Sequence, residues 1–195
     1  MLRTALRGER NSDVPCGGCT ACCTSSQFIH VGPDEVDTLA RIPKHLLFAA
    51  PLLPDGYMVM GYDERGHCPM LEDNRCTIYA HRPRACRTYD CRVLPAAGLH
   101  LDEPERVRIR QQTDRWQFSF ETPTSEVQHD AVRAAAAFLV TRAREFATGT
   151  IPSNTTQLAV AALAIHELFL AEETDGSPRQ APTVDMVRAV LERPS

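Results

Sequence analysis

No apolar run in the sequence approaches the ~20 residues that a membrane-spanning helix requires. The longest apolar segments, residues 134–140 and 158–165, are explained as the buried faces of helices. The first 15 residues carry arginines but no apolar stretch that would serve as a secretory core. The same arginines lie in a partly amphipathic run, which leaves a short organellar presequence as the alternative. We therefore expect a cytoplasmic protein with no membrane partner.

An excess of basic residues is also missing. The chain has 21 Lys and Arg against 25 Asp and Glu, for a net charge of −4. General attraction to nucleic acid or to an anionic membrane needs a basic surface, so nucleic acid is not an expected partner. We find no Ser/His/Asp arrangement, no phosphate-binding P-loop and no H-E-x-x-H motif. The sequence therefore names no catalytic residue, and whether the protein is an enzyme stays open.

Cysteine is absent from the whole C-terminal half. All eight cysteines lie between Cys16 and Cys91. A chain of 195 residues with 43% hydrophobic and 24% charged residues has the composition of a folded domain. In a reducing compartment, clustered cysteines usually bind metals or act in catalysis and do not form disulfides. The clustering therefore favours a metal site.

The residue patterns divide the chain into two regions. Residues 14–124 are rich in cysteine, proline and glycine, and we predict a small metal-binding module with short strands at residues 28–31, 57–62, 76–78, 107–110 and 116–120. The last two alternate with period two, so they are expected to pair with each other or to join the strand at 57–62. Trp116 and the phenylalanines beside it are then interpreted as sheet core.

Helices are predicted on both sides of residue 125. One is opened by Gly32-Pro33-Asp34, with Pro33 or Asp34 near its first turn, and runs through Ile42 until Pro43 ends it. A short helical turn covers residues 82–87. The region 125–195 is predicted to be helical and packed on the module. Its helices are expected at residues 125–148, 155–173 and 184–192, with Ser153 or Asn154 and then Thr183 as caps and Gly149 as a stop. The predicted fold class is α+β, an irregular cysteine-rich module with a helical C-terminal region.

The first cysteine element is Cys16-Gly-Gly-Cys19-Thr-Ala-Cys22-Cys23. A C-x2-C turn brings two thiolates to one side of a tight loop, and small residues allow backbone amides to approach the sulfurs. A third cysteine at the same spacing gives the run that binds three corners of a cluster in bacterial-type ferredoxins. Zinc ribbons pair two C-x2-C turns, and this chain has no separate second one. The spacing favours iron–sulfur, and the adjacent Cys22 and Cys23 indicate a spare thiol, a polynuclear site or two nearby centres.

The second cysteine element spans residues 66–91 and contributes Cys68, Cys76, Cys86 and Cys91. Cys68-Pro69 matches the cysteine–proline that closes a ferredoxin ligand set. His67 and His81 are interpreted as hydrogen-bonding neighbours rather than ligands. Several arginines lie nearby and would either stabilise thiolates or form a solvated surface. They are Arg75, Arg82, Arg84, Arg87 and Arg92.

The combined motifs resemble the YkgJ-type cysteine-cluster family, written CxxCxxCC, from Cys16 to Cys91. The resemblance implies a zinc- or iron-chelating domain. It also implies that the metal-binding cysteines correspond to Cys16, Cys19, Cys22, Cys23, Cys68, Cys76, Cys86 and Cys91. Flagellin lysine N-methylases of that family carry a similar run and are linked to an iron–sulfur cluster and S-adenosylmethionine.

Three hypotheses follow. The first is a redox or accessory protein that holds an iron–sulfur cluster, which is the favoured cofactor, or a Zn²⁺ or iron ion. The second is a structural zinc module whose C-terminal helices dock a protein partner. The third is a cluster-dependent enzyme that uses S-adenosylmethionine, and it depends on the resemblance alone.

Overall fold

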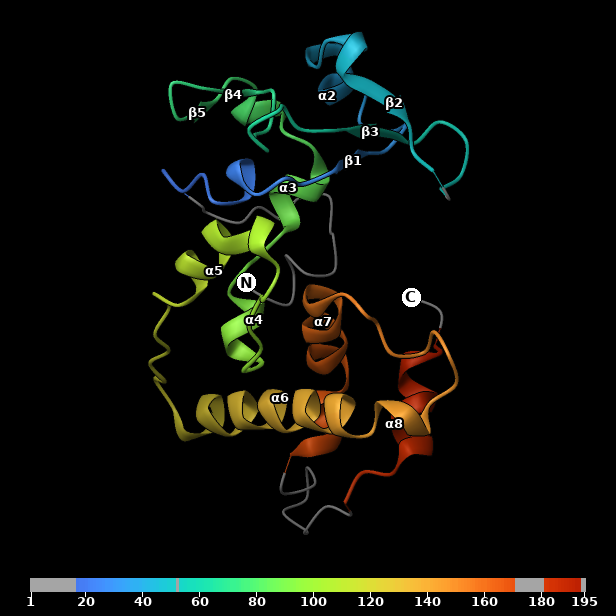
Figure 1. Cartoon of the computed structure of the whole chain (residues 1–195). Helices are drawn as coiled ribbons and strands as arrows, with labels where there is room; N and C mark the ends of the chain where they lie inside the picture. Colours follow the sequence, from blue (N-terminus) through green and yellow to red (C-terminus); the bar gives the residue numbers. More distant parts are fainter. Residues whose placement is uncertain (1–16, 52, 171–180, 194–195) are drawn as a thin grey trace. The chain divides into compact units, whose positions relative to one another are not determined.

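The computed structural model describes residues 17–51, 53–170 and 181–193 (Figure 1). Contacts divide the described chain into two compact units. The first contains the residues up to Asp90 together with Asp102–Gln112, and the second contains Cys91–Leu101 and the residues from Thr113 onward. Helices and small antiparallel sheets confirm the α+β class. Cys16, the N-terminal arginines and residues 171–173 lie outside the described residues. The helix predicted at 155–173 is too long, since the α-helix ends at Ile165 and a 3₁₀ turn follows it.

The first unit is built on a three-stranded antiparallel sheet. The strands are β1 (Ile29–Val31), β2 (Leu47–Ala49) and β3 (Met58–Met60), in the order β1-β3-β2. Met60 pairs with Ile29 on one side and with Leu47 on the other, so these side chains share one face of the sheet. The strands predicted at 28–31 and 57–62 are confirmed.

That face contributes to the apolar core of the first unit. The buried core residues are Val31, Ile42, Met60, Met70 and Ile78. Ile42 follows helix α2 (Val36–Arg41), which ends before Pro43 as predicted. The helix begins later than predicted, because Pro33 and Asp34 form a turn before it. Cys68 and Cys76 are partly buried and pack against this cluster. The core of the first unit therefore borders the second cysteine element.

A two-stranded hairpin positions Cys76. Strands β4 (Leu71–Glu72) and β5 (Arg75–Cys76) are joined by Asp73 and Asn74, whose φ angles of +46° and +59° suit a tight two-residue turn. The strand predicted at 76–78 therefore ends at Cys76. The chain continues through the 3₁₀ turn η3 (Tyr79–His81) to helix α3 (Arg84–Thr88), which begins after Pro83 and confirms the predicted helical turn.

The strand predicted at 107–110 is wrong. A 3₁₀ turn, η4 (Pro104–Arg106), leads into helix α5 (Val107–Thr113) at this position. Ile109 and Thr113 are both buried and lie four residues apart, which is the helical period. An alternating pattern over only four residues fits either a strand or a helix. Pro104 at the start of η4 favours the helix, because its ring fixes φ and the N–H that it lacks would have no partner in a first turn.

The strand predicted at 116–120 is also wrong, and so is the sheet core expected around Trp116. The chain there runs without helix, strand, turn or bend. Trp116 is 41% exposed, and Phe118 and Phe120 are each 38% exposed. The expected partner strand at 107–110 is a helix, so it offers no strand edge for this segment to pair with.

The second unit is helical. It comprises α4 (Val93–Ala96), α6 (Pro123–Thr141), η5 (Ala143–Glu145), α7 (Thr155–Ile165), η6 (His166–Phe169) and α8 (Val184–Leu191). The Asn154 side chain accepts from the backbone N–H of Gln157, and Thr183 accepts from that of Met186, so both predicted caps are confirmed. The helix predicted at 125–148 ends earlier, at Thr141.

Helices α6 and α7 of the second unit are in contact, and both carry buried alanines. Ala135 and Ala136 of α6 and Ala159 and Ala162 of α7 are almost completely buried, and small side chains let two helices approach closely. His166 is buried too, with Nδ1 2.7 Å from the Leu163 carbonyl oxygen, as expected for a satisfied core histidine. None of the helices in the described ranges combines the length and apolar character needed to cross a membrane.

Candidate metal centre

The first cysteine stretch is a compact loop whose backbone folds back on itself. Gly17 has a φ of +58°, and the chain then enters the 3₁₀ turn η1 (Cys22–Thr24). The Thr24 N–H donates to the Thr20 carbonyl at 3.1 Å, and the Ser25 hydroxyl donates to the Ala21 carbonyl at 2.7 Å. These bonds fix the loop that carries Cys19, Cys22 and Cys23.

Backbone hydrogen bonds join this loop to the second cysteine element. The Cys68 N–H donates to the Cys23 carbonyl at 2.7 Å, and the Ser26 N–H donates to the Gly66 carbonyl at 2.8 Å. The Thr20 hydroxyl also donates to the Asn74 side-chain oxygen at 3.1 Å, in the turn of the β4–β5 hairpin. Two stretches that are far apart in the sequence are therefore neighbours at their main chains.

The turn before Cys68 is held by one carboxylate. Asp63 Oδ1 accepts from the backbone N–H groups of Arg65 at 2.9 Å and His67 at 2.8 Å. Arg65 also pairs with Asp63 Oδ2 at 2.9 Å. The hydrogen bond from the backbone N–H of His67 is the main reason that the pKa of Asp63 is lowered. The main chain of His67 thus helps to stabilise the turn that places Cys68 beside Cys23.

Four thiols influence one another electrostatically. Burial raises the pKa of the Cys86 thiol well above its ordinary range. Three other thiols lie close enough to raise that pKa further, those of Cys23, Cys68 and Cys76. The Arg82 guanidinium lowers it. The folded first unit therefore brings four of the predicted ligands, one from the first stretch and three from the second, into one neighbourhood.

Cys68 has a similar environment. Burial raises the pKa of its thiol, the Met70 backbone N–H lowers it, and the Cys76 thiol and the Asp63 carboxylate raise it. Ionised thiolates in this neighbourhood would repel one another and lose solvation. A cation between them opposes both effects, since a coordinated thiol loses its proton to the metal. Zinc, iron ions and iron–sulfur clusters take such thiolate ligands, so the chemistry of this donor set fits them.

Three further described cysteines belong to the predicted ligand set. Cys19 and Cys22 are half-buried in the first loop, and Cys91 is the first residue of the second unit. Across residues 17–51, 53–170 and 181–193, no three Cys, His, Asp or Glu side chains converge tightly enough to hold an ion as they stand. The thiols of Cys23, Cys68, Cys76 and Cys86 are thus neighbours whose donor atoms are not aimed at one point.

The nearby arginines have separate roles. Arg82 is buried, donates to the Tyr79 carbonyl at 2.7 Å and lies 3.8 Å from the centre of the Tyr79 ring. Arg84 forms an ion pair with Asp34 at 2.6 Å, and Arg92 lies 5.6 Å from the Trp116 ring centre within the second unit. The Arg82 guanidinium also lowers the pKa of the Cys86 thiol.

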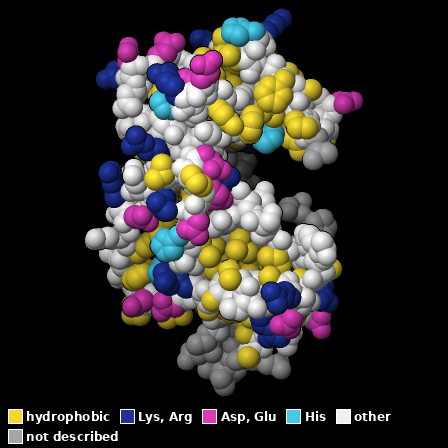
Figure 2. Space-filling model, in the orientation of Figure 1, with side chains coloured by type: hydrophobic (Ala, Val, Ile, Leu, Met, Phe, Trp, Pro, Cys, Tyr) yellow, Lys and Arg dark blue, Asp and Glu magenta, His cyan; other side chains and the backbone are white. Residues whose placement is uncertain are grey.

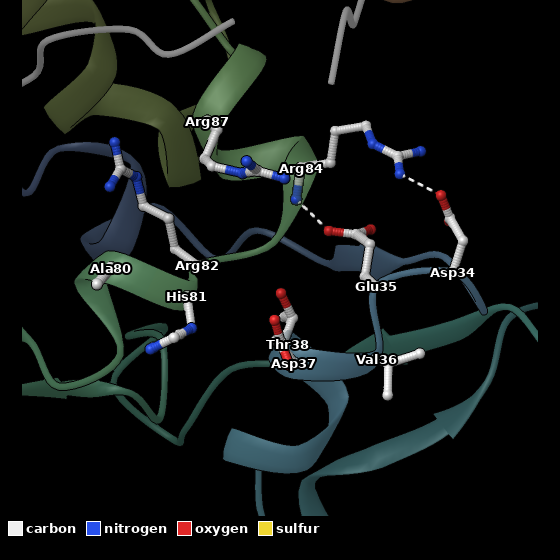
Figure 3. Close-up of a pocket in the computed structure, with 10 residues that line it drawn as sticks. All are labelled: Asp34, Glu35, Val36, Asp37, Thr38, Ala80, His81, Arg82, Arg84 and Arg87. Atoms are coloured by element: carbon white, nitrogen blue, oxygen red, sulfur yellow. Dashed lines mark hydrogen bonds and ion pairs between the residues drawn. The ribbon is translucent and has the colours of Figure 1, made fainter. Parts of the chain in front are cut away.

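A cavity of about 310 Å³ opens beside α3 (Figure 3). Its wall contains three arginines and three carboxylates, and His81 faces it from η3. The lining residues are Asp34, Glu35, Val36, Asp37, Thr38, Ala80, His81, Arg82, Arg84 and Arg87. The charged groups are balanced in sign, and Figure 2 likewise shows acidic and basic side chains interspersed on the visible surface.

Glu35 is the residue at this cavity that the sequence analysis missed. It is 8% exposed, and its two carboxylate oxygens accept from the backbone N–H of Gly32 at 2.8 Å and that of Arg84 at 2.5 Å. It therefore ties the segment after β1 to the first residue of α3, the helix that carries Cys86. The signal was the three-residue spacing from Gly32 to Glu35, which lets a carboxylate reach back to a backbone N–H across a turn.

Residues 15–113, just over half of the chain, match the family model CxxCxxCC, described as "Putative zinc- or iron-chelating domain". The match contains all eight cysteines and agrees with the resemblance seen in the sequence. No curated protein and no solved structure shows significant similarity to the chain.

Proposed function

We propose, since the chain belongs to the CxxCxxCC family of zinc- or iron-chelating domains, that its first unit holds a thiolate-ligated metal centre. The nucleus of this centre is Cys23, Cys68, Cys76 and Cys86. The observation that carries the proposal is the shared neighbourhood of the four thiols, in which three of them raise the pKa of Cys86. A change of side-chain rotamers would be needed to bring the four sulfurs onto one centre.

The other four cysteines remain in the proposed ligand set. Four thiolates satisfy one zinc ion or one cluster, and eight are present. The C-x2-C-x2-C run from Cys16 to Cys22 and the adjacent Cys23 favour an iron–sulfur cluster over a single zinc ion. Such a centre would supply reversible one-electron transfer, and we propose a redox or accessory role in the cytoplasm, where thiols stay reduced.

Purification without oxygen, followed by metal analysis, acid-labile sulfide analysis and X-ray absorption, tests the proposal. Iron and sulfide in similar amounts, with sulfur neighbours around iron, are expected. Zinc without sulfide would remove the iron–sulfur form and leave the thiolate centre. Protein that holds neither metal, even after anaerobic reconstitution, would remove both.

Structural zinc is the second candidate, and one observation favours it. The four thiols come from different pieces of the first unit: the η1 turn, the loop before β4, strand β5 and helix α3. Two of them, Cys68 and Cys76, lie against the apolar core. A single ion would then cross-link the unit, because structural zinc contributes on the order of 10–16 kcal/mol of folding free energy in small sites. Removal of zinc by a chelator should unfold this unit, whereas a redox centre should show a reversible change in its visible spectrum on reduction.

A further inference from the structure

Aromatic and polar residues alternate over residues 116–120 of the second unit, in a segment that pairs with no strand of the described chain. Its aromatic residues stand at every second position, which is the side-chain period of a β-strand. Figure 1 draws it as a plain trace that leads into α6. The rings of Phe118 and Phe120 each lie 5.0 Å from the His129 ring on α6, and both rings stay more than one third exposed.

The main chain of this segment is open for pairing. Within the described part of the chain, the backbone groups of residues 117–120 make no hydrogen bond. Each backbone N–H and C=O is a strong hydrogen-bonding group, and a row of unpaired ones is a template for another strand. The side chains of Phe118 and Phe120 lie toward α6, and strand hydrogen bonds form at right angles to the side-chain direction. The contact with α6 therefore leaves room for a second strand beside the segment.

The charged residues on either side of the aromatic residues favour a second copy of the same segment as the partner strand. An antiparallel pairing of this segment with its own copy, centred on Phe118, places Trp116 opposite Phe120 and Phe118 opposite itself. The same register places Arg115 opposite Glu121, twice around the two-fold axis. Aromatic pairs and opposite charges are favourable across strands, and like charges are not. The segment is thus complementary to itself in both shape and charge.

We propose that residues 115–121 form a homodimerisation strand, which pairs antiparallel with the same residues of a second copy of this chain. The two-fold contact is self-complementary and closes after two copies. The proposal is independent of the metal centre.

Charge reversal tests the register directly. The full chain, kept reduced and loaded with its metal, is measured by analytical ultracentrifugation over a range of concentrations. A reversible dimer is expected. Arg115→Glu alone and Glu121→Arg alone should each raise the dimer dissociation constant by about tenfold, which is ~1.4 kcal/mol. The double variant Arg115→Glu/Glu121→Arg should restore dimerisation, and a mixture of the two single variants should form a heterodimer.

Several outcomes would overturn the proposal. They are a monomer at every concentration, a dimer that ignores both single reversals, or open-ended assembly instead of a dimer. Phe118→Lys places two like charges on the two-fold axis and should abolish the dimer. All the substituted side chains are exposed, so circular dichroism of each variant should match the parent chain and show that the variant is folded. Val140→Lys, at an exposed position of α6, is the matched control and should leave the dimer unchanged.

Discussion

The Cys68 N–H donates a 2.7 Å hydrogen bond to the Cys23 carbonyl, and this bond joins the two cysteine elements at their main chains. A thiol contributed by a flexible side chain can rotate, but a backbone bond fixes where each side chain begins. The first element therefore cannot move away from the second without breaking the bond. The backbone of the first unit therefore holds the two cysteine elements side by side.

Replacing Cys86 should damage metal binding more than any change beside it on α3. Cys86→Ser substitutes a hydroxyl, which is a poor ligand for zinc or iron, in the middle of three thiols. The apparent affinity should fall by more than the roughly 10–100-fold that loss of an outer-shell partner causes. Competition with a chromophoric chelator measures it. Ala85→Ser adds a hydroxyl at an exposed neighbouring position and should bind metal normally. Equal affinity in the two variants would remove Cys86 from the centre.

The metal-free protein should become less stable in mild alkali. Burial raises the pKa of Cys86 and of Cys68 in the folded state, so the unfolded chain releases these protons first as the pH rises. Stability is fully present below the unfolded thiol pKa of about 8.5 and is lost as the pH rises through the higher folded values. Urea unfolding of the reduced protein between pH 7 and 10 measures this. The double variant Cys68→Ser/Cys86→Ser should show a shallower loss, and an identical loss would contradict the cause.

Metal affinity should have the opposite dependence. Each thiol that binds metal gives up its proton, so affinity rises with pH by up to about tenfold per unit for each proton released. Chelator competition at pH 6, 7 and 8 measures the slope. A metal affinity that does not change over this pH range would mean that the ligands are not thiols that lose a proton on binding.

Local chemistry allowed much of the fold to be predicted. Thr183 and Asn154 cap helices as their side chains suggest. The hairpin turn at Asp73-Asn74 was not predicted, although both residue types tolerate positive φ. The failure at residues 107–110 came from a window too short to separate period two from period 3.6. Ile109 and Thr113 reveal the helix only when burial is known.

The site was predictable in its residue types but not in its geometry. Spacing identifies the cysteines, yet nothing local indicates that the Cys68 N–H meets the Cys23 carbonyl or that burial raises the pKa of the Cys86 thiol. Those relationships come from contacts between distant parts of the chain. Glu35 was missed for the same reason, because its second partner, the Arg84 N–H, is 49 residues away.

Gly66→Ala should disturb the join between the two cysteine elements. Gly66 has a φ of +77°, and an added Cβ would collide with the Ser26 hydroxyl. Left-handed backbone costs about 1–2 kcal/mol for an L-residue, and overpacking adds roughly 1–3 kcal/mol. Gly149→Ala should have only the backbone cost, since its φ is +87° and no atom lies within 4 Å of the added Cβ. Denaturant unfolding should therefore show a larger loss for Gly66→Ala, with weaker metal binding in that variant only. Equal losses of stability in the two variants would mean that the Ser26 side chain moves away from the added Cβ at no cost.

Glu35→Gln should loosen the start of α3 even though the shape of the side chain is kept. The carboxylate accepts from two backbone N–H groups, those of Gly32 and Arg84, one on each oxygen. A glutamine offers one oxygen, so its amide N–H₂ must face the other donor. An unsatisfied buried donor costs about 1–3 kcal/mol, and the loss should appear in denaturant unfolding of the metal-free protein. Because α3 carries Cys86, metal affinity should fall as well.

Asp37→Asn is the matched control for that change. Asp37 lies in the first turn of α2, lines the same cavity and is exposed. Its neutralisation removes one charge near the helix start, which is worth ~0.3–1 kcal/mol, and leaves the two backbone donors satisfied. If Glu35→Gln loses stability and metal affinity while Asp37→Asn keeps its affinity, the bridge from Gly32 to Arg84 positions the helix that holds Cys86. If both variants lose affinity equally, the cavity's charge matters and the bridge does not.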